Sequence, residues 1–174
     1  MSGDVTLARR IHRAARLEGS FRLRSGEISP TYFDKYQFES EPKLLADIAE
    51  AMSALVPEGT EVLCGLELGG VPIATMMSQV TGLPTAFIRK APKRYGTCRY
   101  AEGPPLVDRQ ILLVEDVVSS GGAVIDAVNM MRADRIDVSR AVCVIDRRPT
   151  DSDALSQAGI TLDALFTRED IEGA

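Results

Sequence analysis

The sequence contains little of what several common kinds of site require. It has a single histidine, His12, and three cysteines that lie far apart, Cys64, Cys98 and Cys143. Because these residues show no close ligand spacing, a zinc site, a disulfide framework and a histidine-based nucleophile relay have no support. The cysteine usage is typical of a reducing cytoplasm, which is the location we expect.

Long apolar runs, internal repeats and low-complexity tracts are also missing from the sequence. Arginines interrupt the N-terminal segment, so we expect neither a signal peptide nor a membrane span. The 174 residues carry a formal net charge of −5, with a pI near 5.0, which argues against bulk nucleic-acid or membrane-surface binding. A single domain over residues 1–174 is the simplest organisation at this length.

The organising stretch is residues 111–128. Four β-favouring apolar residues, Ile111–Val114, predict a strand buried on both faces, which is typical of a parallel sheet. Glu115 and Asp116 follow. Because adjacent carboxylates are poor core residues, we expect the strand to end there, at the ligand-binding carboxyl edge of the sheet. Residues 119–122 then form a turn before an apolar pattern with helical spacing.

This order of residues has a chemical meaning. Main-chain N–H groups of a glycine-containing turn and of the following helix bind anions, and serine hydroxyls add donors. The upstream acids would repel a phosphate, so their expected partners are hydroxyl groups or a developing positive charge. A ribose 5-phosphate would suit both the anion-binding turn and the upstream acids, although an ordinary strand–turn–helix crossover would give the same pattern. The chain has neither a Walker lysine after the glycines nor a Gly-x-Gly-x-x-Gly at this helix.

The rest of the chain alternates between helical and strand patterns, which predicts an α/β fold with a doubly wound parallel sheet flanked by helices. A small N-terminal hood, from about 1–40, would precede a core from about 41–174. The expected elements are helices at 4–18 (ended by Gly19), from Pro42 (capped by Ser40), at 72–80, after Gly122 and at 152–158, strands at 61–64, 84–88, 141–145 and 161–166, and two short strands within 21–36.

Two further segments carry chemistry. Residues 67–70, Glu-Leu-Gly-Gly, form a second glycine-rich turn between a strand and a helix, which is either a second anion site or a plain crossover. Residues 89–103 begin with five cations in eleven positions, so we expect a long exposed loop. This density of positive charge in an acidic chain favours a polyanionic ligand.

The run from Val114 to Gly122 resembles the phosphoribosyl pyrophosphate (PRPP) motif of type I phosphoribosyltransferases. The resemblance implies that the acids hold the ribose hydroxyls while the turn holds the 5-phosphate. Ser120 and Ala123 depart from the family, which usually has threonine at the first position and often a hydroxyl residue at the second. The motif residues placed on PRPP are Glu115, Asp116, Val117, Val118, Ser119, Ser120, Gly121, Gly122 and Ala123.

Residues 21–34 read Phe-x-Leu-x-Ser-Gly-x-x-Ser-x-x-Tyr-x-Asp, which is similar to the hood of orotate phosphoribosyltransferases. The basic loop resembles their mobile catalytic loop, Arg-Lys-x-x-Lys-x-His-Gly. Tyr95 stands in the histidine position, and a phenol brings no positive charge at neutral pH. The resemblance therefore implies Lys93 and Asp116 as the main catalytic residues. It adds Arg89, Lys90, Lys93 and Tyr95 to the PRPP contacts, and it assigns orotate to Arg24, Tyr32, Phe33, Ser119 and Arg147.

In the same family the turn Glu67, Leu68, Gly69 and Gly70 contacts the pyrophosphate of PRPP, often through a strained or cis peptide. Some orotate enzymes have a lysine where this chain has Gly69, so the contact here would come from backbone N–H groups.

The resemblance covers residues 21–148 and implies a reaction, in which orotate and PRPP give orotidine 5-phosphate and pyrophosphate during de novo pyrimidine synthesis. It also implies Mg²⁺ held mainly by substrate oxygens, with no direct protein ligand, and a homodimer that shares the basic loop across subunits. Nucleic-acid and membrane partners are not expected. A phosphoribosyltransferase for another base and a PRPP- or nucleotide-sensing regulator remain as alternatives.

Overall fold

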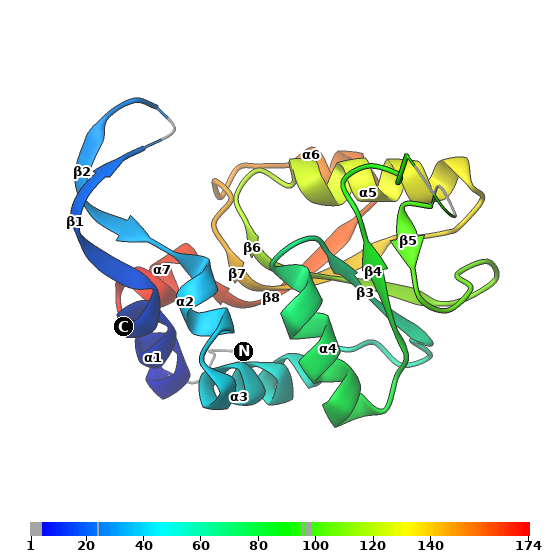
Figure 1. Ribbon diagram of the computed structural model, residues 1–174, viewed down its shortest axis with the longest axis horizontal. Helices are drawn as coiled ribbons and strands as arrows, with labels where there is room; N and C mark the ends of the chain where they lie inside the picture. The colour runs from blue at the N-terminus through cyan, green and yellow to red at the C-terminus, as the bar shows by residue number, and fades with distance from the viewer. Residues whose placement is uncertain (1–4, 24, 95, 97–98) are drawn as a thin grey trace.

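The computed structural model describes residues 5–23, 25–94, 96 and 99–174, and Figure 1 shows their arrangement. The helices and strands are α1 (Val5–Ala15), β1 (Arg16–Arg22), β2 (Ile28–Phe33), α2 (Lys35–Glu39), α3 (Pro42–Ser53), β3 (Val62–Leu66), α4 (Gly70–Thr81), β4 (Thr85–Ile88), β5 (Ala101–Glu102), β6 (Ile111–Val118), α5 (Gly122–Ala133), β7 (Arg140–Asp146), α6 (Ala154–Gln157), β8 (Thr161–Thr167) and α7 (Arg168–Glu172). Among the described residues, no helix combines the length and the apolar content needed to span a bilayer.

The main sheet has six strands in the order β5-β4-β3-β6-β7-β8. All neighbouring pairs are parallel except β4 and β5. Counted along the chain, the five parallel strands follow the order 2-1-3-4-5, one of the two common doubly wound arrangements. The direction of winding reverses between β3 and β6. Ligands bind at such a switch point, outside the carboxyl ends of the strands, so the fold itself marks where a site should lie.

Helices cover both faces of this sheet. In Figure 1, α5 and α6 lie on one side of the strands, and α3 and α4 lie on the other. Side chains alternate along β6 accordingly, since successive residues of a strand point to opposite faces. Leu112 and Val114 pack with α3 and α4, whereas Ile111 and Leu113 pack with α5. The predicted strand buried on both faces is therefore confirmed.

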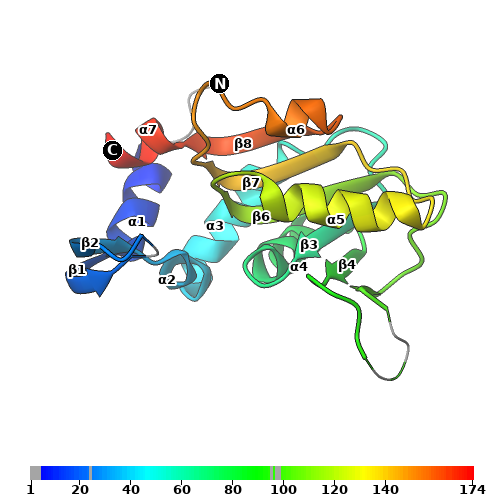
Figure 2. The ribbon, with the colours of Figure 1, turned by 90° about the horizontal axis from the view of Figure 1, so that it is seen from above.

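The N-terminal segment forms a separate layer. Strands β1 and β2 pair antiparallel as a two-stranded sheet, as predicted, and this hood hairpin extends from the body of the molecule in Figure 1. Helix α1 packs its buried residues against the core and contacts the C-terminal helix α7. The hairpin, α1 and α7 thereby meet beside the carboxyl end of β7 (Figure 2).

Two predicted boundaries in this segment were wrong. The first helix ends at Ala15 rather than Glu18, because the chain from Arg16 pairs with β2, and Gly19 lies inside β1 at a register irregularity. Helix α3 is capped by Glu41 rather than Ser40, because Ser40 ends the short helix α2. The Glu41 carboxylate accepts hydrogen bonds from two first-turn N–H groups of α3 and so provides the N-cap that was expected from Ser40.

The position of the acidic pair was also predicted wrongly. Strand β6 continues through Glu115 and Asp116 to Val118, because its ladder with β7 extends to the pair Val118 and Asp146. Both acids are buried, with Asp116 completely enclosed. The expected long loop 89–103 also contains a short strand, since β5 pairs with the end of β4.

Candidate active site

The carboxyl ends of β3 and β6 meet at the switch point, where a cavity of about 370 Å³ opens. We call this space the turn cavity. It is lined by Lys35, Tyr36, Glu67, Leu68, Lys90, Glu115, Val117, Val118, Ser119, Ser120, Gly121, Gly122, Ala123 and Val124. Most of the residues that the sequence placed on PRPP are therefore brought together around one space.

The turn after β6 presents main chain to this cavity. Gly121 is the N-cap of α5 and has a φ of 83°, in the left-handed region that favours glycine. A Cβ atom at this position would also lie 2.9 Å from the Leu155 side chain. Gly121 makes no side-chain cap, and the Gly122 N–H donates only a long, 3.4 Å hydrogen bond to Ser120 Oγ, so the first turn of α5 can offer N–H groups to a ligand. Together with the exposed hydroxyls of Ser119 and Ser120, they form the predicted anion-binding geometry.

The turn after β3 packs tightly against β6. The Glu67–Leu68 peptide bond is cis, as the family resemblance implied for this turn. A Cβ atom on Gly70 would overlap the Val114 carbonyl, and a Cβ atom on Gly69 would overlap the Asp116 carboxylate. Gly70 is therefore required by its close approach to the main chain, whereas a side chain at position 69 would have to displace the Asp116 and Glu39 carboxyl groups.

Three carboxyl groups and one ammonium group meet behind this turn. Lys35 Nζ lies 2.6 Å from Asp116 Oδ2, and both Lys35 and Glu39 come from α2, one helical turn apart. The Glu39 carboxyl hydrogen-bonds Asp116. Glu115 contributes a second buried carboxyl from the neighbouring position of β6, and its Oε2 has no hydrogen-bond partner in the part of the chain that the structure describes.

The pKa values of this cluster diverge. Burial, reinforced by the hydrogen bond and the charge of Asp116, raises the pKa of Glu39 to about 9. Burial together with the same neighbouring charge raises the pKa of Glu115 to about 9. Burial would raise the pKa of Asp116 too, but hydrogen bonds from Glu39 and Lys35 outweigh it and lower that pKa. At neutral pH the cluster thus holds one ionised carboxylate, Asp116, between two neutral acids and a lysine.

Of the described residues of the basic loop, some line the turn cavity and others do not. Lys90 lines the cavity, and its backbone N–H donates a 2.7 Å hydrogen bond to Glu67 Oε1. Arg89 and Lys90 also line an adjoining cavity of about 440 Å³. Lys93 instead pairs with Glu102 of β5 and lines neither space. Tyr95 lies outside the described residues, as does Arg24.

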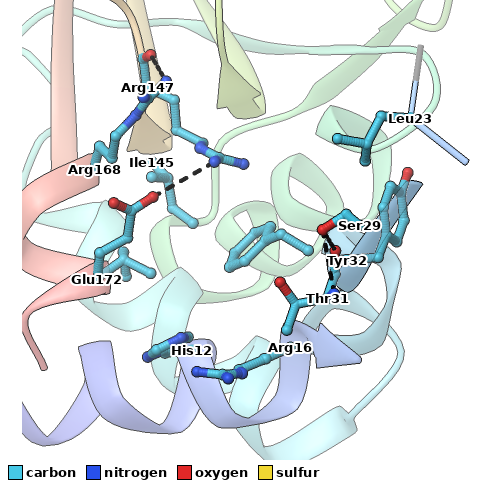
Figure 3. Close-up of a pocket in the computed structure, with 12 residues that line it drawn as sticks. His12, Arg16, Leu23, Ser29, Thr31, Tyr32, Ile145, Arg147, Arg168 and Glu172 are labelled. Atoms are coloured by element: carbon cyan, nitrogen blue, oxygen red, sulfur yellow. Dashed lines mark hydrogen bonds and ion pairs between the residues drawn. The ribbon is translucent and has the colours of Figure 1, made fainter. Parts of the chain in front are cut away.

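A further cavity of about 430 Å³, which we call the hood cavity, lies between the hood hairpin, α1 and α7 (Figure 3). It contains the predicted orotate residues Tyr32, Phe33 and Arg147. The Arg147 guanidinium carbon lies 5.2 Å from the centre of the Phe33 ring, which is cation–π geometry. Ser119, also predicted to contact orotate, lines the turn cavity instead.

The hood cavity adds charged residues that the sequence analysis missed. His12 and Arg16 come from the end of α1 and the start of β1, and Arg168 and Glu172 come from α7. Glu172 Oε1 lies 3.6 Å from Arg147 Nη2, and an Arg168 guanidinium N–H donates to the Arg147 carbonyl. No sequence motif points to His12, and the contact between α1 and α7 accounts for its place in the cavity.

Comparisons with known proteins agree with this geometry. A model of the phosphoribosyl transferase domain family matches residues 36–157. An orotate phosphoribosyltransferase from Nocardioides is 47% identical over 174 residues, which are 100% of this chain and 97% of that protein. This chain belongs to the orotate phosphoribosyltransferase family. The family enzyme from Methanocella arvoryzae is 36% identical over 155 residues, 89% of each chain. A crystal structure of Mycobacterium tuberculosis orotate phosphoribosyltransferase, in complex with Fe(III) dicitrate, superposes with a TM-score of 0.83 at 25% identity, covering 96% of this chain and 97% of that one.

Membership in the orotate phosphoribosyltransferase family confirms the predicted fold class and makes the chain an enzyme, a pentosyltransferase. Lys35 of the turn cavity and Glu39 of the cluster behind it nevertheless escaped the family motifs. Lys35 and Glu39 belong to a helix of five residues, too short to show a periodic pattern. The spacing of a lysine and a glutamate four residues apart, directly after the hood motif, was the one signal that could have pointed to them.

The raised pKa values predict an unusual pH dependence of stability for this orotate phosphoribosyltransferase family member. Between the ordinary glutamate pKa of 4.5 and the folded value of about 9, Glu39 and Glu115 bind protons in the folded state but are ionised in the unfolded state. The folded state therefore holds more protons, and the free energy of unfolding falls as pH rises, by about 1.4 kcal/mol per pH unit for each such proton.

Urea titrations at pH 6.0, 7.0 and 8.5 measure this slope. We expect Glu39→Gln to reduce the slope of stability against pH, since glutamine does not titrate. The exposed Glu50→Gln should leave the slope as in the wild type. A wild-type protein whose stability rises over this interval would contradict the assignment of protonated carboxyl groups.

Proposed function

We propose that the protein transfers the 5-phosphoribosyl group of PRPP to orotate, giving orotidine 5-phosphate and pyrophosphate in de novo pyrimidine synthesis. The turn cavity is the observation that carries this proposal. Its uncapped helix N-terminus suits a phosphate, and Glu115 in the same cavity suits hydroxyl groups. The hood cavity and the turn cavity are connected through the main chain, because the Arg147 N–H donates a 2.8 Å hydrogen bond to the Val118 carbonyl.

The 5-phosphate of PRPP would bind the N–H groups and hydroxyls of residues 119–122. The ribose hydroxyls would then reach Glu115, whose Oε2 is buried at the cavity wall without a partner among the described residues. A protonated carboxyl can donate one hydrogen bond and accept others, so it matches a hydroxyl group better than a carboxylate alone. Asp116 lies behind it as the ionised member of the cluster.

Orotate would bind between Phe33 and Arg147. The guanidinium fork presents parallel N–H donors that match a carboxylate, and the Phe33 ring supplies a flat apolar surface for the base. The 3.6 Å contact with Glu172 is long for a hydrogen bond, so Arg147 keeps donors for a ligand. These contacts support orotate over a base without a carboxylate.

The expected chemistry is direct displacement at ribose C1 through an oxocarbenium-like state. Burial raises the pKa of the Cys64 thiol to about 12 and that of the Cys143 thiol well above its usual value, so neither thiol is a nucleophile. Catalysis would be positioning and electrostatics, with the Asp116 charge near the cationic sugar and the basic loop on the departing pyrophosphate. Closure of the loop would bring Lys93 to the site and exclude water.

We also propose Mg²⁺ as the cofactor, held mainly by oxygens of PRPP, as the family resemblance implies. Among the described residues no group of three or more His, Cys, Asp or Glu side chains is placed to hold a metal ion. Glu115 lines the turn cavity, but its raised pKa keeps it protonated at neutral pH, so it would contact a water of the ion rather than the ion itself. When bound, Mg²⁺ supplies charge neutralisation for the diphosphate.

We further propose a cytoplasmic homodimer in which the basic loop reaches the neighbouring subunit's site. This rests on the family resemblance of the loop. It is supported by the loop's course in Figure 2, where the chain after β4 runs out beyond the edge of the sheet.

Orotate absorbance, followed with PRPP and Mg²⁺ present, tests the proposed reaction. We expect orotate to be consumed and orotidine 5-phosphate to form, with no reaction of uracil or hypoxanthine. Consumption of another base in place of orotate would establish a different phosphoribosyltransferase. PRPP binding without turnover of any base would favour the sensing regulator.

A further inference from the structure

The turn after β3 brings no cation of its own to a diphosphate. A Cβ atom at Gly69 would overlap the Asp116 carboxylate and would lie 2.9 Å from Glu39 Oε1, so a side chain there would have to displace both carboxyl groups. Of the two residues before it, Leu68 is apolar and exposed, and Glu67 is acidic with its carboxylate occupied by the Lys90 N–H. Within this turn only the main chain can hold a phosphoryl group, so every cation has to come from another segment, such as Lys90 of the basic loop.

Lys35 lies where the missing cation would be needed. It lines the turn cavity together with Glu67 and Leu68, although it comes from α2, more than 30 residues earlier in the chain. Its side chain is 32% exposed, so part of it is open to the cavity that it lines. Asp116, against which Gly69 packs, is also the partner of Lys35. The Lys35 ammonium group and the place where a side chain of residue 69 would lie are therefore both next to the Asp116 carboxylate.

The charge arrangement leaves Lys35 able to bind an anion. An ammonium group has three N–H donors, and Lys35 Nζ lies 2.6 Å from Asp116 Oδ2 and 5.4 Å from the centre of the Tyr36 ring, contacts that do not use all three. Burial would lower the pKa of Lys35, but the hydrogen bond and the charge of Asp116 outweigh it and raise that pKa, so the group is charged at neutral pH. A cation held at the wall of a cavity by a buried carboxylate is in place before the ligand arrives, which reduces the cost of ordering it on binding.

We propose that Lys35 binds the diphosphate group of PRPP at the turn after β3, supplying from α2 the cation that Gly69 cannot carry. This rests on the proposed function, since it takes PRPP as the ligand. Glu39 acts as a positioning residue, because its carboxyl shares Asp116 with Lys35 and so fixes the carboxylate from the opposite side. When Lys35 contacts the diphosphate, part of the Asp116 charge is released to face the sugar, which links leaving-group binding to the stabilisation of C1.

Isothermal titration with three ligands tests the proposal, using Mg²⁺ throughout. The variant is Lys35→Met, which keeps an unbranched stem and removes the charge, and the control is Lys43→Met on the exposed start of α3. We expect Lys35→Met to weaken inorganic pyrophosphate and PRPP about 10- to 100-fold, the loss of one charge-assisted hydrogen bond. Ribose 5-phosphate, which has no diphosphate, should bind within about twofold of wild type.

Equal weakening of all three ligands would show that Lys35 merely supports the fold, and unchanged pyrophosphate affinity would also overturn the proposal. A measurement on the wild type covers the case in which the variant does not fold. Acetylation of lysines, read by mass spectrometry, should modify Lys35 less when pyrophosphate is added but not when ribose 5-phosphate is added, while Lys43 stays equally reactive. Equal acetylation of Lys35 in all samples would count against the contact.

The proposed reaction and the proposed Lys35 contact can fail separately. If wild-type protein binds PRPP and pyrophosphate but does not consume orotate, the proposed base is wrong while the Lys35 contact stands. If orotate is consumed and Lys35→Met binds pyrophosphate like wild type, the reaction stands and the contact is wrong.

Discussion

Replacing Lys93 with alanine is expected to lower kcat about 10²- to 10³-fold, the usual effect of removing one preorganised donor to a developing charge. In the free protein the Lys93 ammonium pairs with Glu102 at the base of the loop, outside the turn cavity. It therefore has to leave Glu102 when the loop closes over the pyrophosphate. Because the contact forms only in the closed state, the loss should appear in kcat rather than in the affinity for PRPP.

Steady-state kinetics at saturating orotate and PRPP measure this effect, and a thermal melt accompanies them. The melting temperature should change little, since Lys93 is outside the core and its ion pair with Glu102 is partly exposed. Lys43→Ala is the matched control and should keep wild-type kcat. Near-normal turnover in Lys93→Ala would show that this loop lysine has no part in catalysis.

The parts of the fold that follow from local pattern could be read from the sequence. The buried run Ile111–Val114 and the glycine turn after it predicted β6 and α5, because four β-favouring residues and a helical apolar period leave few alternatives. The same reasoning failed for the two residues after Val114, which were expected to end the strand. Whether Glu115 and Asp116 are buried depends on Lys35 and Glu39, which reach them only after α2 has folded beside β6.

The hood cavity, too, could be predicted only in part from local sequence. Phe33 and Arg147 were predicted from motif and family, but the pairing of Arg147 with Glu172 requires α7, a helix of five residues with no visible periodicity. His12 and Arg16 lie far from Arg168 in sequence and meet it only because α1 packs against α7. Local signals identify each strand and turn, whereas charged neighbours across elements are fixed by packing that no single stretch encodes.

The largest expected effect belongs to Asp116→Asn. Asp116 is fully buried, accepts from Lys35 and Glu39, and is the one carboxyl of the cluster whose pKa is lowered. An asparagine amide would turn an N–H donor toward one of these donors, leaving Lys35 or Glu39 without an acceptor. Since Lys35 keeps about a third of its side chain exposed, we take the lower end of the usual penalty for breaking a buried pair, about 3 kcal/mol.

For a chain of this length, that loss corresponds to a fall in melting temperature of about 6–12 °C. The kinetic effect should be larger, because in the proposed mechanism the variant removes the negative charge that stabilises the cationic sugar. We expect kcat/KM for PRPP to fall about 10²- to 10⁴-fold, measured at 20 °C where the variant is still folded. Asp137→Asn, at an exposed position remote from both cavities, is the control and should change neither quantity. If Asp116→Asn lost stability but kept its kcat/KM for PRPP, the carboxylate would hold Lys35 in the fold without acting on the sugar, and the charge released by Lys35 would have no role in the reaction.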